Sequence, residues 1–236
     1  MNLKVLYEDN HIIAVVKPAG VLTQGDMSGK ESLLDQVKKY LKEKYKKPGN
    51  VFLGLVHRLD KPVQGIVLFG KTSKGASRLS EQFRNHTIQK IYHAIIIGRP
   101  KESKGVLKEK VHKISFFAEG FAKKSDQELL EEIKKATKSR TAELGFEVVK
   151  SNNNYSLLKI TPKTGRFHQI RIQMANMGHP ILGDLKYTLQ AQSKIQKTLP
   201  DQSIGLAATG ISFKTATGEK TVDLQIPLPE EWKGYI

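Results

Sequence analysis

The pattern of hydrophobic and polar positions predicts that the chain opens with a β-hairpin and an amphipathic helix. Residues 3–7 and 11–17 are short apolar runs on either side of the polar turn EDN, and Pro18 ends the second run because it has no N–H for a ladder. Apolar residues then recur every four positions over residues 31–45, with lysines on the other face, as in a helix with one buried side. The apolar positions of this helix are Leu33, Val37 and Leu41.

The middle of the chain combines apolar runs with a second helix. The run GIVLFGKT, residues 65–72, predicts a buried strand, a helix starts at Ser73, and QKIYHAIIIG, residues 89–98, returns to β structure. Residues 101–140 have the least regular pattern, with basic runs and one short helix, so we expect a variable basic insertion here. The capping box of that short helix consists of Ser125 and Glu128.

Two hairpins and a third helix are predicted for the last part of the chain. Residues 141–150 and 155–161 form strands joined by the turn sequence SNNN. A helix over residues 167–177 follows, and Gly178 is placed as its C-terminal stop. The strands of the closing hairpin, about the turn ATGE, are residues 204–214 and 220–226.

This order of elements predicts the fold class. Hairpins outnumber β-α-β units, so we expect an α+β fold with a mixed, mainly antiparallel sheet flanked by helices. With 236 residues, of which 39% are hydrophobic, the chain can bury a full core. This length suits one large domain or two closely joined lobes, and we expect residues 1–236 to form a single domain.

Charge narrows the possible partners. Lysine and arginine number 39 against 23 acids, a net charge of +16, which favours a polyanion, either nucleic acid or an anionic membrane surface. No apolar run reaches the roughly 18 residues of a transmembrane helix, and acids interrupt the N-terminal apolar residues, so we expect a cytoplasmic protein. The absence of cysteine excludes disulfides and thiolate metal sites.

Residues 54–65, GLVHRLDKPVQG, place one carboxylate among cations. Arg58 and Lys61 lie beside Asp60, and nearby positive charge favours an ionised carboxylate. An ionised carboxylate suits a nucleophile or a charge stabiliser, whereas a general acid must hold a proton. The alternative is that Asp60 only caps a turn ahead of Pro62.

A second charged group occurs in TGRFHQIRIQMANMGHPILGD, residues 164–184. Arg166 and His168 lie at the start of the predicted helix, and Arg171 follows His168 by three residues, near the same face. An arginine on a rigid helix can grip one carboxylate or one phosphate with two parallel hydrogen bonds. The alternative is an exposed basic helix end.

Taken together, the segments resemble a known family. HRLDKPVQG, QKIYHAIIIG and GRFHQIRIQMANMGHPILGDLKY, in this order and spacing, resemble the catalytic segments of the RluA family of RNA pseudouridine synthases. The opening EDNHIIAVVKPAGV resembles that family's first segment, so the resemblance covers residues 3–228. It implies the pseudouridine synthase fold with an active-site cleft across the sheet, and an isomerase that uses no cofactor and no metal.

The resemblance also implies a role for each site residue. Asp60 is the aspartate that attacks the target uridine, and Arg171 pairs with it and keeps its carboxylate ionised. Tyr92 stacks on the base and takes part in proton transfer. Arg58 fills the gap left when the nucleotide flips out of its stack. The other residues assigned to RNA binding are His57, Lys61, Lys90, Arg166, His168 and Gln169.

The chain departs from the family pattern beside these residues. Val63 and Gln64 stand where many relatives carry Thr-Ser, and LAA near residue 206 lacks a histidine. Phe167 stands where a serine or threonine commonly follows the Gly-Arg pair. These departures leave the proposed catalytic side chains intact and concern backbone contacts and substrate preference.

Two alternatives remain open at this point. His57, His168 and His179 can be combined into a metal site with Asp60 or Asp184 as a further ligand. A structural hydrogen bond is the more ordinary role of such histidines. The alternative to an enzyme is a catalytically inactive RNA-binding or RNA-folding protein on the same fold, although such a protein has no need of the intact catalytic set.

The predicted partner is structured RNA, either ribosomal RNA or transfer RNA. The first strand begins at residue 3, so we expect no separate N-terminal RNA-binding module, which favours a compact stem-loop such as a tRNA arm. The lysine-rich segments 38–47 and 134–140 either contact phosphate or keep the protein soluble. We expect a monomer, since nothing resembles a coiled-coil seam.

Overall fold

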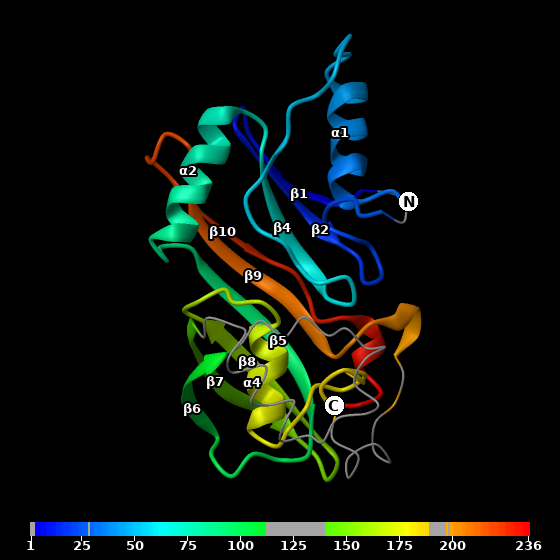
Figure 1. Ribbon diagram of the computed structural model, residues 1–236, viewed down its shortest axis with the longest axis vertical. Coiled ribbons are helices and arrows are strands. Elements are labelled where there is room, and N and C mark those ends of the chain that lie inside the picture. Colours follow the sequence, from blue (N-terminus) through cyan, green and yellow to red (C-terminus); the bar gives the residue numbers. More distant parts are fainter. Residues whose placement is uncertain (1–2, 28, 112–139, 189–196, 198) are drawn as a thin grey trace.

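The computed structural model describes residues 3–27, 29–111, 140–188, 197 and 199–236 (Figure 1). Within these residues, ten strands form a single sheet, and three α-helices and two short 3-10 helices accompany it. The strands are β1 Val5–Glu8, β2 Ile12–Lys17, β3 Gly54–Leu55, β4 Gln64–Gly70, β5 Gln89–Ile97, β6 Lys104–Val111, β7 Arg140–Ser151, β8 Tyr155–Pro162, β9 Leu206–Lys214 and β10 Thr221–Gln225. The helices are α1 Leu33–Lys44, α2 Ser73–Arg84, α4 Gln169–Asn176, and the 3-10 turns Pro200–Gln202 and Glu230–Trp232.

The sheet consists of two halves joined by a short parallel seam. The strand order is β1-β2-β4-β9-β5-β8-β7-β6, with β3 paired to β4 and β10 to β9. Every pair of these strands is antiparallel except β4 and β9, which meet in parallel at Gln64 and Gly65. Gly65 has φ 139°, and a Cβ there would lie 2.3 Å from the carbonyl oxygen of Ala208. Only glycine allows the two backbones to approach this closely.

Helices cover both faces of the sheet, which explains why strand β2 is apolar at nearly every position. Ile13 and Val15 belong to a core cluster that contains residues of α1, while Ile12 and Ala14 belong to another cluster that contains Leu79 of α2. Successive side chains of a strand point to opposite faces, so a strand that is covered twice must be apolar throughout. In Figure 1, α1 and α2 accompany the N-terminal half of the sheet and α4 accompanies the other half.

Local sequence signals fix where the helices begin and end. The Ser32 side chain accepts a hydrogen bond from the Asp35 amide while the Asp35 side chain accepts one from the Ser32 amide, a complete capping box for α1. Helix α2 begins at Ser73, as predicted, and Thr72 provides its cap. Gly178 follows α4 with φ 83°, as expected for a glycine stop.

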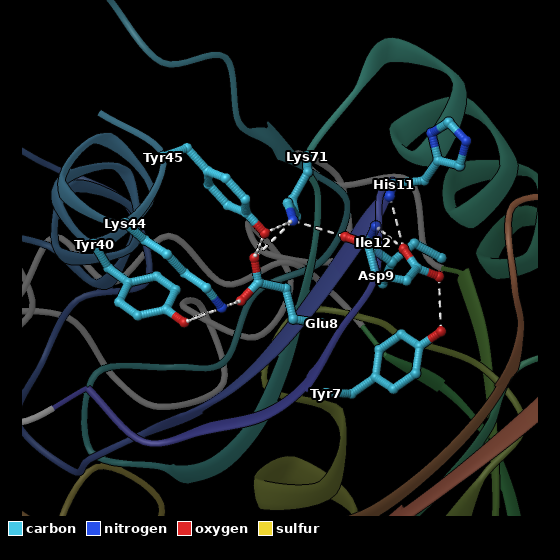
Figure 2. A network of polar contacts seen from close by, with 9 residues as sticks. All are labelled: Tyr7, Glu8, Asp9, His11, Ile12, Tyr40, Lys44, Tyr45 and Lys71. Atoms are coloured by element: carbon cyan, nitrogen blue, oxygen red, sulfur yellow. Dashed lines mark hydrogen bonds and ion pairs between the residues drawn. The ribbon is translucent and has the colours of Figure 1, made fainter. Parts of the chain in front are cut away.

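A network centred on Glu8 ties the first hairpin to α1 and to the end of β4 (Figure 2). One carboxylate oxygen of Glu8 accepts from Lys71 and Tyr45, both at 2.7 Å, and the other accepts from Lys44 at 2.7 Å and Tyr40 at 3.0 Å. Burial opposes ionisation of Glu8, but these hydrogen bonds outweigh it and lower its pKa to about 2.

The predicted fold class is confirmed, with corrections to individual elements. The prediction of an irregular region over residues 101–140 is wrong in its first part, because Lys104–Val111 forms strand β6 at the edge of the sheet. The short helix expected at Ser125 and Glu128 lies outside the described residues. The helix expected over 167–177 is shorter, Gln169–Asn176, because His168 has a left-handed backbone with φ 48°. None of the helices described is long and apolar enough to cross a membrane.

Candidate active site

Asp60 lies in the loop between β3 and β4. The segment after β2 forms hydrogen bonds to the residues on either side of Asp60. Thr23 Oγ1 donates to the carbonyl of Leu59 at 2.8 Å and accepts from its amide at 3.2 Å. The carbonyl of Lys61 accepts from the amide of Gly20 at 2.9 Å. The backbone before and after the aspartate is therefore fixed by one short segment, residues 20–23.

Lys17 is buried between this segment and the Asp60 loop and forms hydrogen bonds to both. Its side chain is fully buried, and Nζ donates to the carbonyls of Pro18 at 3.0 Å, Val21 at 2.7 Å and Lys61 at 3.1 Å. Burial lowers the pKa of Lys17 to about 7, and the negative charge of Asp60 opposes this shift. Three acceptor carbonyls match the three N–H groups of the ammonium form.

The turn that follows Asp60 does not use its side chain. The amide of Val63 donates to the backbone carbonyl of Asp60 at 3.0 Å, whereas the carboxylate oxygen Oδ2 accepts from Arg171 Nη1 at 3.2 Å. The interpretation of Asp60 as a turn cap is therefore wrong. Its side chain is 31% exposed, and among the described residues no group donates a hydrogen bond to its other oxygen, Oδ1.

Arg171 joins Asp60 to a second acid, Asp184. Its Nε donates to Asp184 Oδ2 at 2.6 Å and its Nη2 donates to Asp184 Oδ1 at 2.8 Å, a bidentate pair that is almost fully buried. Burial opposes the charge on Arg171, but Asp184 and then Asp60 outweigh it and raise the arginine pKa. Asp184 therefore fixes the guanidinium in a plane, and the remaining Nη1 reaches Asp60.

His168 and Tyr187 form a second support for the same carboxylate oxygen. His168 Nε2 lies 3.4 Å from Asp60 Oδ2, and its Nδ1 lies 2.7 Å from the Tyr187 hydroxyl. Burial lowers the pKa of His168 to about 4 although Asp60 opposes the shift, and burial raises the pKa of Tyr187 to about 12. Both are neutral at pH 7, which fits a Tyr187 hydroxyl donating to Nδ1 and a histidine Nε2–H directed at Asp60.

A pocket opens beside Asp60 at the seam between the two halves of the sheet. Tyr92 of β5 lines it; burial and then the charge of Asp60 raise the tyrosine pKa, so the phenol keeps its proton. Lys90 of the same strand also lines it, and burial lowers the pKa of this lysine. The full lining is Arg58, Leu59, Asp60, Val63, Lys90, Tyr92, Pro162, Thr164, Gly165, Arg166, His168, Gln169, Ile170, Arg171 and Leu206.

Of the other residues assigned to RNA binding, some are accessible at or near the pocket and one forms contacts inside the protein. Arg58 and Arg166 line the pocket, so they are placed to reach a ligand in it. Lys61 is exposed on the loop beside Asp60. His57 Nε2 instead accepts from the Leu68 amide at 2.9 Å, and its ring contacts Phe83. Contact of these residues with RNA stays a prediction.

Gln169 links residues of the pocket wall to one another through its side-chain amide. Its Oε1 accepts from Thr164 Oγ1 at 2.7 Å and from the Arg166 amide at 3.0 Å, and its Nε2 donates to the carbonyl of Glu143 at 3.1 Å. These bonds fasten the loop before α4 to strand β7. The amide therefore has a structural role that its assignment to RNA binding did not include.

The three histidines considered for a metal site are not brought together. His57 binds the Leu68 amide, His179 lies 2.8 Å from the carbonyl of Ile97, and only His168 lies beside Asp60. In the part of the chain that the structure describes, no group of three histidine, aspartate or glutamate side chains is arranged to hold a metal ion.

Sequence reasoning missed Lys17 and Thr23, and it considered Asp184 only as a metal ligand. The motif KPAGV contains Lys17, but a lysine before a proline gives no sign of burial. Asp184 stands within the segment that carries the resemblance, and a buried arginine nearby requires a fixed anion, which is the signal that points to it.

Comparison with known proteins agrees with this geometry. Residues 11–176 match the family described as RNA pseudouridylate synthase. The chain is 31% identical to "tRNA pseudouridine synthase C" of Vibrio cholerae, over 99% of this chain and 94% of that protein. It is 34% identical to the protein of the same name from Yersinia pestis, over 99% and 90%, and 29% identical to "Ribosomal large subunit pseudouridine synthase C" of Buchnera aphidicola, over 99% and 69%.

A solved structure supports the fold. The human protein "RNA Pseudouridylate Synthase Domain Containing 4" superposes with a TM-score of 0.72, covering 96% of this chain and 89% of that one at 21% identity. The chain belongs to the RNA pseudouridylate synthase family. The prediction of an RNA pseudouridine synthase, an isomerase with RNA as its partner, is thereby confirmed, and nothing in these comparisons favours the inactive alternative.

Proposed function

We propose that this protein isomerises a uridine of structured RNA with Asp60 as the residue that acts on the ribose. The observation that carries this role is the one-sided support of the carboxylate. Arg171 and His168 both approach Oδ2 of Asp60, so Oδ1 remains for the substrate in the pocket. A charged acid that is oriented through one oxygen is prepared for attack with the other.

The reaction balances within the substrate. The bond between C1′ and N1 breaks, the uracil turns, a bond forms between C1′ and C5, and the proton lost from C5 is matched by one gained at N1. Asp60 acts on the ribose either by addition at C1′ or by removing the C2′ proton for elimination. Tyr92, whose raised pKa keeps it protonated before the reaction, stacks on the base and takes part in the transfer by which the proton lost from C5 is replaced by one at N1.

The pocket requires the nucleotide to leave its stack. Unstacking costs a few kcal/mol, and the cationic rim offsets this cost through phosphate contacts. Arg58 and Arg166 line the pocket on the strand-loop side and the helix side. We propose that Arg166 contacts phosphate and that Arg58 fills the gap left by the flipped nucleotide.

Transfer RNA is the substrate class that we propose. The relatives named for tRNA align over 94% and 90% of their own length, whereas the relative named for ribosomal RNA aligns over 69%. A tRNA arm also presents a compact stem-loop, which suits a single pocket at the centre of one domain.

Mapping of pseudouridine with and without the gene tests this function. Total tRNA and rRNA from a gene-deletion strain are compared with those of the parent, and the purified protein is then incubated with the deletion-strain RNA. We expect a site that is lost on deletion and restored in a tRNA by the protein. A restored site in rRNA alone would overturn the substrate class, and no restored site in any RNA would overturn the enzyme.

A further inference from the structure

Phe167 is a large, partly exposed aromatic side chain that lies between two pocket-lining residues in the sequence. It is 41% exposed, and both neighbours in sequence, Arg166 and His168, line the pocket. Its ring lies 3.8 Å from the His168 ring, centroid to centroid, at an interplanar angle of 13°. One side of the ring is therefore occupied by a parallel aromatic, while much of the residue faces water.

The support beneath this ring is rigid. His168 is held by the Tyr187 hydroxyl at 2.7 Å and lies beside both Arg171 and Asp60. Its left-handed backbone, φ 48°, turns the chain at this point and places residue 167 ahead of α4. A ring stacked on a fixed ring loses little conformational freedom when a third ring joins the stack.

We propose that Phe167 is a stacking platform for a nucleobase that flanks the uridine in the pocket, and so contributes to the choice of substrate. The inference rests on the proposed function, because it takes the pocket as the uridine site. The surroundings select a nucleobase over an apolar partner: an aromatic ring beside Arg166, in a chain of net charge +16, combines a stacking surface with phosphate attraction.

Stacking and electrostatic attraction can be separated by their response to salt. Each phosphate contact adds to the slope of log affinity against log salt concentration, whereas stacking does not. Loss of Phe167 is therefore expected to lower the affinity for RNA by the same factor at every salt concentration. Loss of Arg166 is expected to reduce the slope itself by about 1.

The probe is a short oligouridylate with 2-aminopurine at one internal position, titrated against the full-length protein at several salt concentrations. Phe167→Ala should weaken binding about 5- to 100-fold with an unchanged salt slope, and should remove the fluorescence quenching that stacking causes. Phe167→Trp should restore both. Phe52→Ala is the matched control, because Phe52 is 52% exposed and neither of its sequence neighbours lines the pocket, whereas both neighbours of Phe167 do.

Steady-state kinetics on deletion-strain tRNA distinguishes two roles of Phe167: stacking on a nucleobase of the substrate, and supporting His168 within the protein. A platform lost by Phe167→Ala raises KM and leaves kcat nearly unchanged. A fall in kcat that tryptophan does not rescue would mean that Phe167 only supports His168, and would overturn the inference. Binding within twofold of the parent protein would also overturn it. The proposed function fails separately, if Asp60→Asn retains activity.

Discussion

The protein builds two clusters in which a cation and other polar groups surround one acid, and the acid is more accessible in one cluster than in the other. Around Glu8, two lysines and two tyrosines satisfy both carboxylate oxygens, and the side chain is 9% exposed. Around Asp60, an arginine and a histidine approach one oxygen, and the side chain is 31% exposed. A fully satisfied carboxylate stabilises the fold, whereas a half-satisfied one at a pocket is able to react.

The largest expected effect comes from the accessible acid. Asp60→Asn keeps the size of the side chain and removes its charge and nucleophilicity, so the rate of pseudouridine formation should fall by a factor of about 10⁴ or more. RNA affinity should stay nearly unchanged, because binding depends on the cationic rim. Release of tritium from RNA labelled at C5 of uridine and filter binding measure the two quantities. Substantial residual activity would remove Asp60 from its proposed role.

A smaller loss is expected when the guanidinium beneath Asp60 loses its anchor. Asp184→Asn weakens the bidentate pair with Arg171, so Asp60 loses its fixed orientation and kcat should fall about a hundredfold, an effect typical of misplacement by about 1 Å. The free energy of unfolding should also fall by up to about 3 kcal/mol.

Glu81→Gln is the control for Asp184→Asn. Glu81 forms a pair with Arg78 in which both side chains are at least half exposed, and such pairs contribute little. Single-turnover kinetics and urea unfolding measure both variants. Equal kinetics in the two would contradict the anchoring role of Asp184.

The hydrogen bonds from Lys17 and Thr23 to the Asp60 loop should affect kcat less than the ion pairs of Arg171 do. Lys17→Met preserves the length of the side chain and removes its three hydrogen bonds to carbonyls, so the loop is less fixed and kcat should fall about tenfold. Thr23→Val, which removes the bonds to Leu59, should change kcat in the same direction. Unchanged kcat in both variants at 25 °C would show that the loop does not need these hydrogen bonds.

The smallest effect on activity is expected at the satisfied acid. Glu8→Gln should leave kcat unchanged and lower the free energy of unfolding at pH 7 by about 1–3 kcal/mol. The folded-state pKa of Glu8, about 2, lies below its ordinary value of 4.5, so its stabilisation is complete above pH 4.5 and is lost as pH falls toward 2.

Urea unfolding at pH 7, 4 and 2.5 measures this pH dependence. The difference between the parent protein and Glu8→Gln should shrink at each step. A difference that is constant over this range would mean that the charge of Glu8 contributes nothing to stability.

The regular elements differ in how far the sequence predicts them. Helices α1 and α2 and the central strands follow from apolar spacing because packing on one or two faces imposes that spacing. Strand β6, the last strand of the sheet among the described residues, was missed because lysines and a glutamate interrupt the apolar positions of its sequence KGVLKEKV and hide the strand pattern.

The site was only partly predictable for a different reason. Asp60 and Arg171 are 111 residues apart in sequence, and their pairing was expected from the family resemblance, not from either segment alone. The bidentate pair of Arg171 with Asp184 and the three carbonyls around Lys17 depend on loop paths that periodicity does not encode. The need of a buried arginine for a fixed anion points to Asp184, whereas nothing near Lys17 in the sequence indicates that it is buried.

The candidate site spans the parallel seam between β4 and β9, so it needs both halves of the sheet. Asp60 belongs to the N-terminal half of the sheet and Arg171 to the other half, and the two halves meet at Gln64 and Gly65. A chain that has folded only its first hairpins holds an acid without its cation. Catalytic competence therefore requires that both halves of the sheet have formed and have met at the seam.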